Sequence, residues 1–304
     1  MSVTFRHRTV LLAETVALLR PGAQRVIVDG TLGGGGHAEA LLEAGATVVG
    51  LDRDPAALTA ARARLGRYGD RFRAVEGNYA EALALVGHPV HGFLLDLGVS
   101  SHQLDTPERG FSFQADGPLD MRMGHTGPTA AELIASLDEQ TLADTIYRDG
   151  EERFSRQIAR RLKHDLPTTT AQAVKSVEAA VPRKDWPKNI HVATRTFQAL
   201  RIAVNDELGA LDTALEGLDA LLLPGGVAAI ISFHSLEDRR VKQAFKVLCG
   251  DVPDETPRGF PVAPVKAEAR FQALTRKPIE ASDAEVADNP RARSAKLRGV
   301  EKRS

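Results

Sequence analysis

Cysteine is nearly absent from this sequence, since Cys249 is the single one among 304 residues. One thiol cannot form an internal disulfide, and it cannot build a cysteine-based zinc site. We therefore expect neither a disulfide framework nor a metal cofactor.

Long hydrophobic runs are also lacking. No uninterrupted apolar segment approaches the roughly 20 residues that a membrane-spanning helix requires, which excludes an integral membrane helix. The early apolar stretch at residues 10–19 contains Glu14 and lacks the small-residue cleavage pattern of a signal peptide. The sequence therefore predicts a cytoplasmic protein with no membrane partner.

An excess of charge of one sign is missing as well. The 39 basic and 40 acidic residues leave a net charge of −1, so the whole molecule generates no field that attracts nucleic acids or acidic membranes. Any polyanionic partner must be bound by local basic patches. The length and the 43% of hydrophobic residues are sufficient for one large or two ordinary domains.

The first hundred residues alternate between strand and helix patterns. We expect strands at residues 26–28, 47–51, 72–75 and 93–95, and helices at 37–43, 55–66 and 79–86. Pro55 is well suited to the first position of its helix. This alternation is typical of a parallel, doubly wound sheet with an α/β fold.

The alternation stops between residues 105 and 205, where helical patterns occur without a convincing strand. The expected helices lie at residues 130–136, 139–147, 152–164, 170–180 and from 194 onward. We therefore expect an inserted all-helical domain at 105–208, with the α/β domain formed by residues 1–104 and 209–304.

After the insertion, α/β patterns return. Leucines at 211, 215, 218 and 222 have the spacing of one buried helix face, Pro224-Gly225-Gly226 predicts a turn, and residues 227–233 predict a strand. The remaining tail contains a helical pattern at 237–248, a proline-rich loop at 252–265 and weak strand patterns at 271–274 and 296–300.

The strongest chemical signal is a glycine-rich segment directly after the first expected strand. Asp29 ends that strand, and the segment Gly30-Thr31-Leu32-Gly33-Gly34-Gly35-Gly36-His37 follows. Glycines let the backbone approach a ligand closely, and the next helix presents free N–H groups with the positive end of its dipole. The spacing Gly33-x-Gly35-x-x-Ala38 also fits the dinucleotide fingerprint, so a nicotinamide cofactor is an alternative.

Acidic residues follow three of the expected strands. Asp52 ends the second strand and would accept hydrogen bonds from ribose hydroxyls in either cofactor class. Asp29 precedes the glycines, where an acid suits a cofactor with a cationic amino-acid end better than a pyrophosphate. Asp96 ends the fourth strand. A lone aspartate at such a position is usually a helix cap, but three of them predict one ligand-binding edge of the sheet.

Seven segments together resemble the bacterial ribosomal RNA small-subunit methyltransferase H family. They comprise 30–37, Leu51-Asp52-Arg53-Asp54-Pro55, Leu95-Asp96-Leu97-Gly98-Val99-Ser100-Ser101, Glu108-Arg109-Gly110-Phe111-Ser112-Phe113, Asp116-Gly117-Pro118-Leu119-Asp120-Met121-Arg122-Met123, Ile231-Ser232-Phe233-His234-Ser235-Leu236-Glu237-Asp238-Arg239 and Asn289-Pro290-Arg291-Ala292-Arg293-Ser294. With Thr9-Val10-Leu11-Leu12 they are distributed from the beginning of the chain to its tail, so the resemblance extends over nearly the whole chain.

This resemblance implies a class I, Rossmann-like S-adenosylmethionine-dependent methyltransferase sheet. It implies transfer of a methyl group to the exocyclic N4 of a cytosine in the decoding centre, at the P site, of 16S rRNA in the small ribosomal subunit. The family's cofactor-binding positions correspond to Gly35, Gly36, His37, Asp52, Tyr79, Asp96 and Gln103.

Asp96 is also our candidate catalytic residue. The methyl group is already activated on a sulfonium, so the main requirement is alignment of the N4 lone pair with the methyl carbon. A hydrogen-bond acceptor for the amine would favour attack, and Asp96 is preferred over Ser100 or a backbone carbonyl. Many base-amino methyltransferases have Pro-Pro and an aromatic after this acid, whereas Leu97-Gly98-Val99 follows here, so stacking of the target base is not predicted.

The insertion is expected to recognise RNA. On the helix expected at 152–164, an apolar face alternates with a basic stripe formed by Arg153, Arg156, Arg160 and Lys163, although basic stripes are often only solvated surface. Two further candidates are the region of Arg183, Lys184, Trp186 and Lys188 and the tail at 291–303. The alternative from another class is a non-enzymatic RNA-binding assembly factor.

Overall fold

The computed structural model describes residues 9–251 and 269–304, and the proline-rich segment expected at 252–265 lies outside them. The chain divides into two compact units. One combines the chain up to Gly98 with the chain from Gly209 onward, and the other is Val99–Leu208. The first boundary therefore falls six residues before the one expected from the sequence, because residues 99–104 belong to the second unit.

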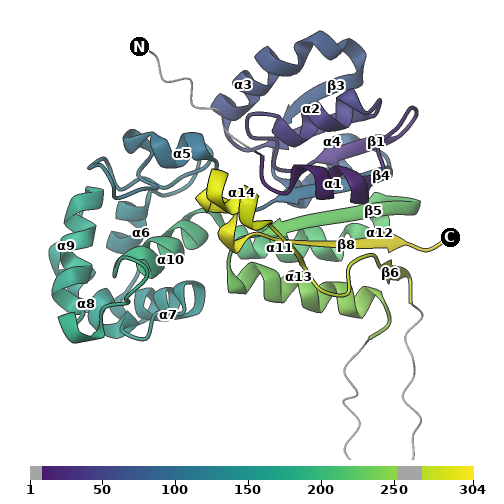
Figure 1. Ribbon diagram of the computed structural model, residues 1–304. Coiled ribbons are helices and arrows are strands. Elements are labelled where there is room, and N and C mark those ends of the chain that lie inside the picture. The colour runs from purple at the N-terminus through teal and green to yellow at the C-terminus, as the bar shows by residue number, and fades with distance from the viewer. Residues whose placement is uncertain (1–8, 252–268) are drawn as a thin grey trace, which may run out of the picture. The chain divides into compact units, whose positions relative to one another are not determined.

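Within the described residues of the first unit, eight strands form one sheet in the order β3-β2-β1-β4-β5-β8-β6, with β7 also paired to β8. The first five are mutually parallel, and β8 runs antiparallel to β5 (Figure 1). The strands are β1 (Val26–Asp29), β2 (Thr47–Asp52), β3 (Phe72–Glu76), β4 (Val90–Asp96), β5 (Leu222–Ser232), β6 (Phe271–Ala273), β7 (Ile279–Glu280) and β8 (Lys296–Lys302). This is the expected α/β fold, with the Rossmann-like sheet that the resemblance implies.

Helices cover both faces of this sheet because successive strand residues point to opposite sides. Ile27 and Leu94 pack with helices α1, α2 and α3, whereas Val28 and Leu95 pack with α4, α11, α12 and α13. The helices of this unit are α1 (Leu12–Leu19), α2 (Gly36–Glu43), α3 (Pro55–Leu65), α4 (Ala82–Val86), α11 (Glu207–Glu216), α12 (Leu218–Leu221), α13 (Ser235–Leu248) and α14 (Asp283–Asp288), with short 3-10 turns η1 (Gly66–Arg71), η2 (Tyr79–Glu81) and η5 (Pro290–Ser294).

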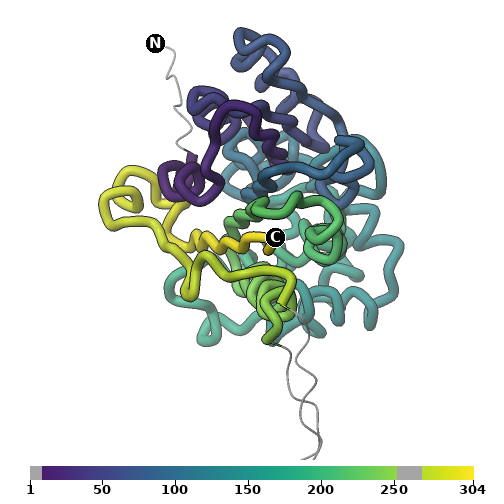
Figure 2. Tube along the Cα trace, turned by 90° about the vertical axis from the view of Figure 1, so that its right-hand side faces the viewer, coloured from purple at the N-terminus to yellow at the C-terminus, as the bar shows by residue number. Residues whose placement is uncertain are grey.

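The C-terminal segment packs against the beginning of the chain. The Leu11 N–H donates to the Glu285 carboxylate of α14 at 2.8 Å, and Ala292 of η5 belongs to the same hydrophobic cluster as Leu11. Figure 2 shows these C-terminal turns, in yellow, beside the purple α1. The segment around Leu11 is therefore held against the core of the first unit by contacts with α14 and η5.

The second unit is helical, as the sequence predicts. Its helices are α5 (Ser101–Asp105), η3 (Pro107–Arg109), α6 (Ala130–Ser136), α7 (Glu139–Gly150), α8 (Ser155–Asp165), α9 (Thr170–Ala180), η4 (Arg183–Asp185) and α10 (Thr194–Asn205). Thr129 and Thr169 begin α6 and α9 with capping boxes. A separate hydrophobic cluster with Leu142, Ile158 and Leu200 lies at its centre, so this unit has its own core.

Three details differ from the sequence prediction. The leucine-spaced helix is broken at Gly217 into α11 and α12, and Leu222 begins β5. The turn expected at 224–226 lies inside β5, where the pairing with β4 shifts register between Val90 and Gly92 and Gly225 has φ of 72°. A bulge accommodates these residues without ending the strand. The expected helix at 79–86 begins with the 3-10 turn η2.

Candidate active site

The glycine-rich segment joins β1 to α2 and lies against two neighbouring strands. The Gly30 N–H donates to the Leu94 carbonyl at 2.8 Å, and the Leu32 N–H donates to the Leu51 carbonyl at 2.9 Å. A side chain at Gly30 would place its Cβ 2.6 Å from Leu95 Cδ2 and 2.8 Å from Tyr79 Cβ, so only glycine fits there. The segment is therefore fixed between β2 and β4.

Gly35 forms the N-cap of α2 with φ of 79°, a left-handed conformation that favours glycine. No side chain of the described residues caps this helix end. The first N–H groups of an α-helix have no partner within the helix, and its dipole favours a negative group there. The Gly35 N–H donates to the Leu32 carbonyl at 2.8 Å, and the N–H groups of the first helical turn, from Gly36 onward, lie at this positive end of the helix.

Asp52 ends β2 and holds the glycine loop from the neighbouring strand. One carboxylate oxygen accepts from the Gly33 N–H at 2.8 Å, and the other accepts from the Asp54 N–H at 2.9 Å. Burial raises the pKa of Asp52, and these two hydrogen bonds oppose the shift. The Asp52 side chain therefore links the glycine loop to the start of α3.

Asp29 ends β1 and is only 1% exposed. Its carboxylate accepts from the Thr31 N–H at 3.2 Å. Burial raises the pKa of Asp29 to about 7, with a further contribution from the negative charge of Asp52. Near neutral pH this carboxyl group is therefore close to its own midpoint of ionisation.

Asp96 ends β4, and its backbone N–H donates to the Thr31 hydroxyl at 2.6 Å. Its Oδ1 atom is buried and has no hydrogen-bond partner in the described part of the chain, while Oδ2 lies 3.7 Å from His37 Nδ1. Burial, followed by the charges of Asp29 and Glu237, raises the pKa of Asp96 to about 8. A carboxyl group without donors in such surroundings favours its neutral form.

The position of Glu237 was not identified from the sequence. It lies in the first turn of α13, is 2% exposed, and accepts from the Phe233 N–H at 2.8 Å and the His234 N–H at 3.3 Å. His234 Nε2 lies 3.1 Å from the same carboxylate. The signal was present, because an acid three residues after a helix N-cap is typical of a capping box. Asp29, Asp52, Asp96 and Glu237 are called the carboxyl cluster below.

The other expected cofactor residues lie in different surroundings. Tyr79 begins η2 and packs partly buried beside the hydrophobic cluster of the first unit, next to Gly30. Gln103 belongs to the second unit, where its side chain accepts from the Ser100 N–H at 3.0 Å in a capping box at the start of α5. The first unit thus brings together His37, Asp52, Tyr79 and Asp96 but not Gln103.

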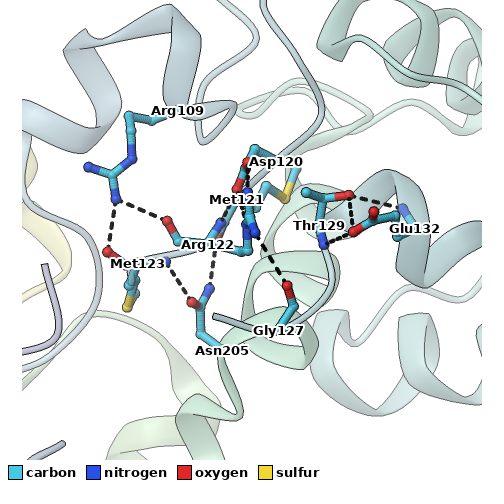
Figure 3. A network of polar contacts seen from close by, with 9 residues as sticks. All are labelled: Arg109, Asp120, Met121, Arg122, Met123, Gly127, Thr129, Glu132 and Asn205. Atoms are coloured by element: carbon cyan, nitrogen blue, oxygen red, sulfur yellow. Dashed lines mark hydrogen bonds and ion pairs between the residues drawn. The ribbon is translucent and has the colours of Figure 1, made fainter. Parts of the chain in front are cut away.

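In the second unit, a polar network fixes the loop between η3 and α6 (Figure 3). Arg122 donates to both carboxylate oxygens of Asp120, at 2.9 and 2.7 Å, and Arg109 donates to the carbonyls of Arg122 and Met123 at 2.9 Å each. Asn205 is buried, accepts from the Met123 N–H and donates to the Met121 carbonyl, both at 2.8 Å. Side-chain hydrogen bonds therefore hold this loop, which has no regular secondary structure.

The basic stripe expected on α8 is largely engaged within the unit. Arg153 pairs with Asp185 at 2.8 Å, and Arg160 pairs with Glu139 at 3.3 Å. Lys163 donates to the carbonyls of Ile134 and Ala135 at the end of α6. Arg156 is exposed and forms no ion pair within residues 9–251 and 269–304. The stripe thus contains one uncompensated cation, because its other members have structural partners.

The two other basic regions also have internal partners. The Trp186 indole N–H donates to the Val181 carbonyl at 3.0 Å, and the Arg183 guanidinium lies 5.5 Å from the ring centroid. Trp186 therefore anchors its own segment to the core of the unit. In the tail, Arg298 pairs with Asp238 at 2.7 Å, which reduces the positive charge available there.

Residues 9–251 and 269–304 contain no helix long and apolar enough to cross a membrane. They also contain no group of three or more His, Cys, Asp or Glu side chains arranged to hold a metal ion.

Comparison with known proteins gives strong matches over nearly the full length. A sequence model described as the MraW methylase family matches residues 4–303. A protein named ribosomal RNA small subunit methyltransferase H from Myxococcus xanthus is 60% identical over 98% of each chain. A protein of the same name from Geobacter sulfurreducens is 52% identical over 99% of this chain and 100% of the relative.

Among solved structures, the chain is similar to a putative rRNA methylase from Clostridium thermocellum. The TM-score is 0.46 at 10% sequence identity, over 99% of each chain.

Proposed function

Since this chain belongs to the MraW methylase family, we propose that it methylates the exocyclic N4 of a cytosine in 16S rRNA, at the P site of the decoding centre in the small ribosomal subunit. The protein is an S-adenosylmethionine-dependent methyltransferase, which removes the nicotinamide alternative. The names of its relatives support a small-subunit rRNA substrate. A ribosomal substrate would place the enzyme in the cytoplasm.

The residues of the first unit fit S-adenosylmethionine. The cofactor has a cationic sulfonium, an amino-acid end and a ribose with two hydroxyls. A buried carboxyl oxygen of Asp96 without a partner suits the cationic part, and the uncapped N-terminus of α2 suits the carboxylate of the amino-acid end. When bound, the cofactor supplies a methyl group activated on sulfur.

We assign roles to the site residues on this basis. The backbone at Gly35, Gly36 and His37 would hold the amino-acid end, Asp52 would accept from the ribose hydroxyls, and Tyr79 would lie beside the adenine. Asp52 is suitable because each of its oxygens accepts one backbone N–H and retains a lone pair. Gln103, in the second unit, would contribute to cofactor or substrate binding from the start of α5.

Asp96 would orient the target amine as the catalytic residue. It ends β4, and parallel sheets bind ligands beyond the carboxyl ends of their strands. An acceptor for the N4 hydrogens keeps the lone pair directed at the methyl carbon. In Asp96→Asn we expect the single-turnover rate constant to fall by about 100-fold, a larger loss than that in cofactor affinity. If the entire loss appears in the dissociation constant, Asp96 is a binding residue only.

The helical insertion at Val99–Leu208 would contact the RNA. Its separate core and its fixed loop at Asp120–Met123 provide a rigid surface, and Arg156 offers a cation for phosphate. This role distinguishes the enzyme from a minimal cofactor-binding sheet.

The decisive experiment is mass spectrometry of 16S rRNA nucleosides after incubation of unmethylated small subunits with the protein and S-adenosylmethionine. We expect N4-methylated cytosine at one position. The variant Asp96→Asn is the control and should produce much less of this nucleoside in the same time. Methylation at another atom would overturn the N4 assignment. Tight binding to the subunit without methyl transfer would favour the assembly-factor alternative.

A further inference from the structure

His37 Nδ1 and the Asp96 carboxyl group face each other in the first unit. His37 Nε2 lies 3.1 Å from the Val10 carbonyl, which can only accept, so Nε2 carries a hydrogen. In the neutral ring, Nδ1 is then an acceptor, and it lies 3.7 Å from Asp96 Oδ2. Two acceptors face each other unless one of them is protonated.

The surroundings favour a proton on Asp96 itself. Its Oδ1 is buried and receives no hydrogen bond in the described part of the chain. The charged groups facing it are Asp29 from β1 and Glu237 from α13, while His37 faces it from α2. Asp52 acts on Asp29, and His234 lies beside Glu237. Burial and these negative neighbours raise the pKa of Asp96 to about 8, which agrees with the geometry.

From this arrangement we propose that Asp96, facing His37, holds one proton in the ligand-free enzyme, loses it when the cationic cofactor binds, and receives the proton that leaves the methylated amine. The last part rests on the proposed function. A positive sulfonium beside Asp96 would stabilise the ionised carboxylate, as an opposite charge does at a distance of a few ångströms. The loss of that charge on transfer would favour the neutral form again.

The step is balanced in atoms and charge. The N4 lone pair forms the bond to the methyl carbon, and the electron pair of the carbon–sulfur bond passes to sulfur. The amine then carries one proton too many, which moves to the Asp96 carboxylate. A neutral carboxyl group, a neutral thioether and a neutral methylated base result, so no buried charge remains at this residue when the products leave.

The test is calorimetric titration of the full-length protein with S-adenosylmethionine and with S-adenosylhomocysteine, without RNA. Measurements at pH 7 in two buffers of different ionisation enthalpy give the number of protons released. We expect the sulfonium ligand to release about half a proton or more beyond the thioether, because Asp96 is mostly protonated at that pH. This excess should vanish in Asp96→Asn and persist in the control Asp138→Asn, which removes an exposed helix-capping carboxylate of the other unit.

A second measurement needs no variant. The ratio of the two affinities in the wild-type enzyme should rise by about tenfold or more between pH 6 and pH 8 and level off above it, since proton loss precedes tight binding of the cation. An unchanged ratio, or an excess of released protons that Asp96→Asn retains, would overturn the proposal. No RNA is present in either calorimetric measurement, so its result does not depend on which atom of the base is methylated. The proton release by Asp96 and the N4 assignment can therefore fail independently of each other.

Discussion

The polar network of the insertion and the carboxyl cluster of the sheet differ in how far their polar side chains find hydrogen-bond partners. Asp120 receives three hydrogen bonds from Arg122, and Asn205 meets two backbone groups of the neighbouring loop. Asp96 Oδ1, in contrast, has no donor within the described residues, and its nearest charged neighbours include two further acids. Satisfied groups stabilise a fold, whereas an unsatisfied, like-charged cluster costs stability and indicates a place for a cationic ligand.

Among the variants that test this comparison, we expect the largest change in stability from a substitution in the polar network of the insertion. Asn205→Ala removes the partners of the Met121 carbonyl and the Met123 N–H, and each unsatisfied buried group costs about 1 to 3 kcal/mol. We expect the free energy of unfolding to fall by about 3 kcal/mol in urea denaturation. The control Gln140→Ala removes one exposed hydrogen bond and should change stability by less than about 0.5 kcal/mol. A loss below about 1 kcal/mol for Asn205→Ala would show that water replaces its contacts.

In the carboxyl cluster, Asp52 differs from Asp96 because both of its oxygens accept backbone hydrogen bonds. We propose that its remaining lone pairs accept from the ribose of the cofactor. Asp52→Ala should weaken S-adenosylmethionine binding by about 1.5 to 3 kcal/mol, the range for hydrogen bonds to charged groups. Asp52→Asn keeps one oxygen acceptor and should lose less. Titration calorimetry measures both, and an unchanged affinity in Asp52→Ala would exclude this residue from the ribose site.

The sequence predicted the parts of this contrast that depend on local patterns. Strand periodicity located β1 to β3 closely, and the acids following the strands identified three of the four members of the carboxyl cluster. β4 begins at Val90, earlier than expected, because Gly92 lacks strand propensity but pairs with Ile27 of β1 and Val227 of β5. Tertiary pairing overrides local propensity there.

What the sequence could not predict depends on contacts between distant residues. Lys163 lies in an obvious basic stripe, yet it donates to carbonyls at the end of α6, 28 and 29 residues earlier in the chain. Trp186 has the composition of a stacking residue, but its N–H is used by Val181. Likewise, tertiary packing decides whether a charged side chain has an ion-pair partner, and sequence periodicity does not predict that packing.

The pH dependence of stability tests the carboxyl cluster alone. In the folded protein the pKa values of Asp29 and Asp96 are raised to about 7 and about 8, against about 4 for an unfolded aspartate. The folded state therefore binds more protons between pH 4 and pH 8, and its stability falls as pH rises through that window. We expect the ligand-free protein to lose about 1 to 3 kcal/mol between pH 6 and pH 8.5, and Asp96→Asn to lose less. Stability that increases over this interval would contradict the assignment.

The smallest effect concerns the one uncompensated cation of the α8 stripe. If Arg156 contacts a phosphate, Arg156→Gln should lower the slope of log affinity for the small subunit against log salt concentration by roughly 0.7 to 0.9. Arg153→Gln is the matched control on the same face, since Asp185 already compensates Arg153, and its slope should change by less. Filter binding at several salt concentrations measures both slopes. Equal slopes for both variants and the wild type would make the stripe an ordinary solvated surface, and the exposed cations Arg183, Lys184 and Lys188 would then be the next residues to neutralise.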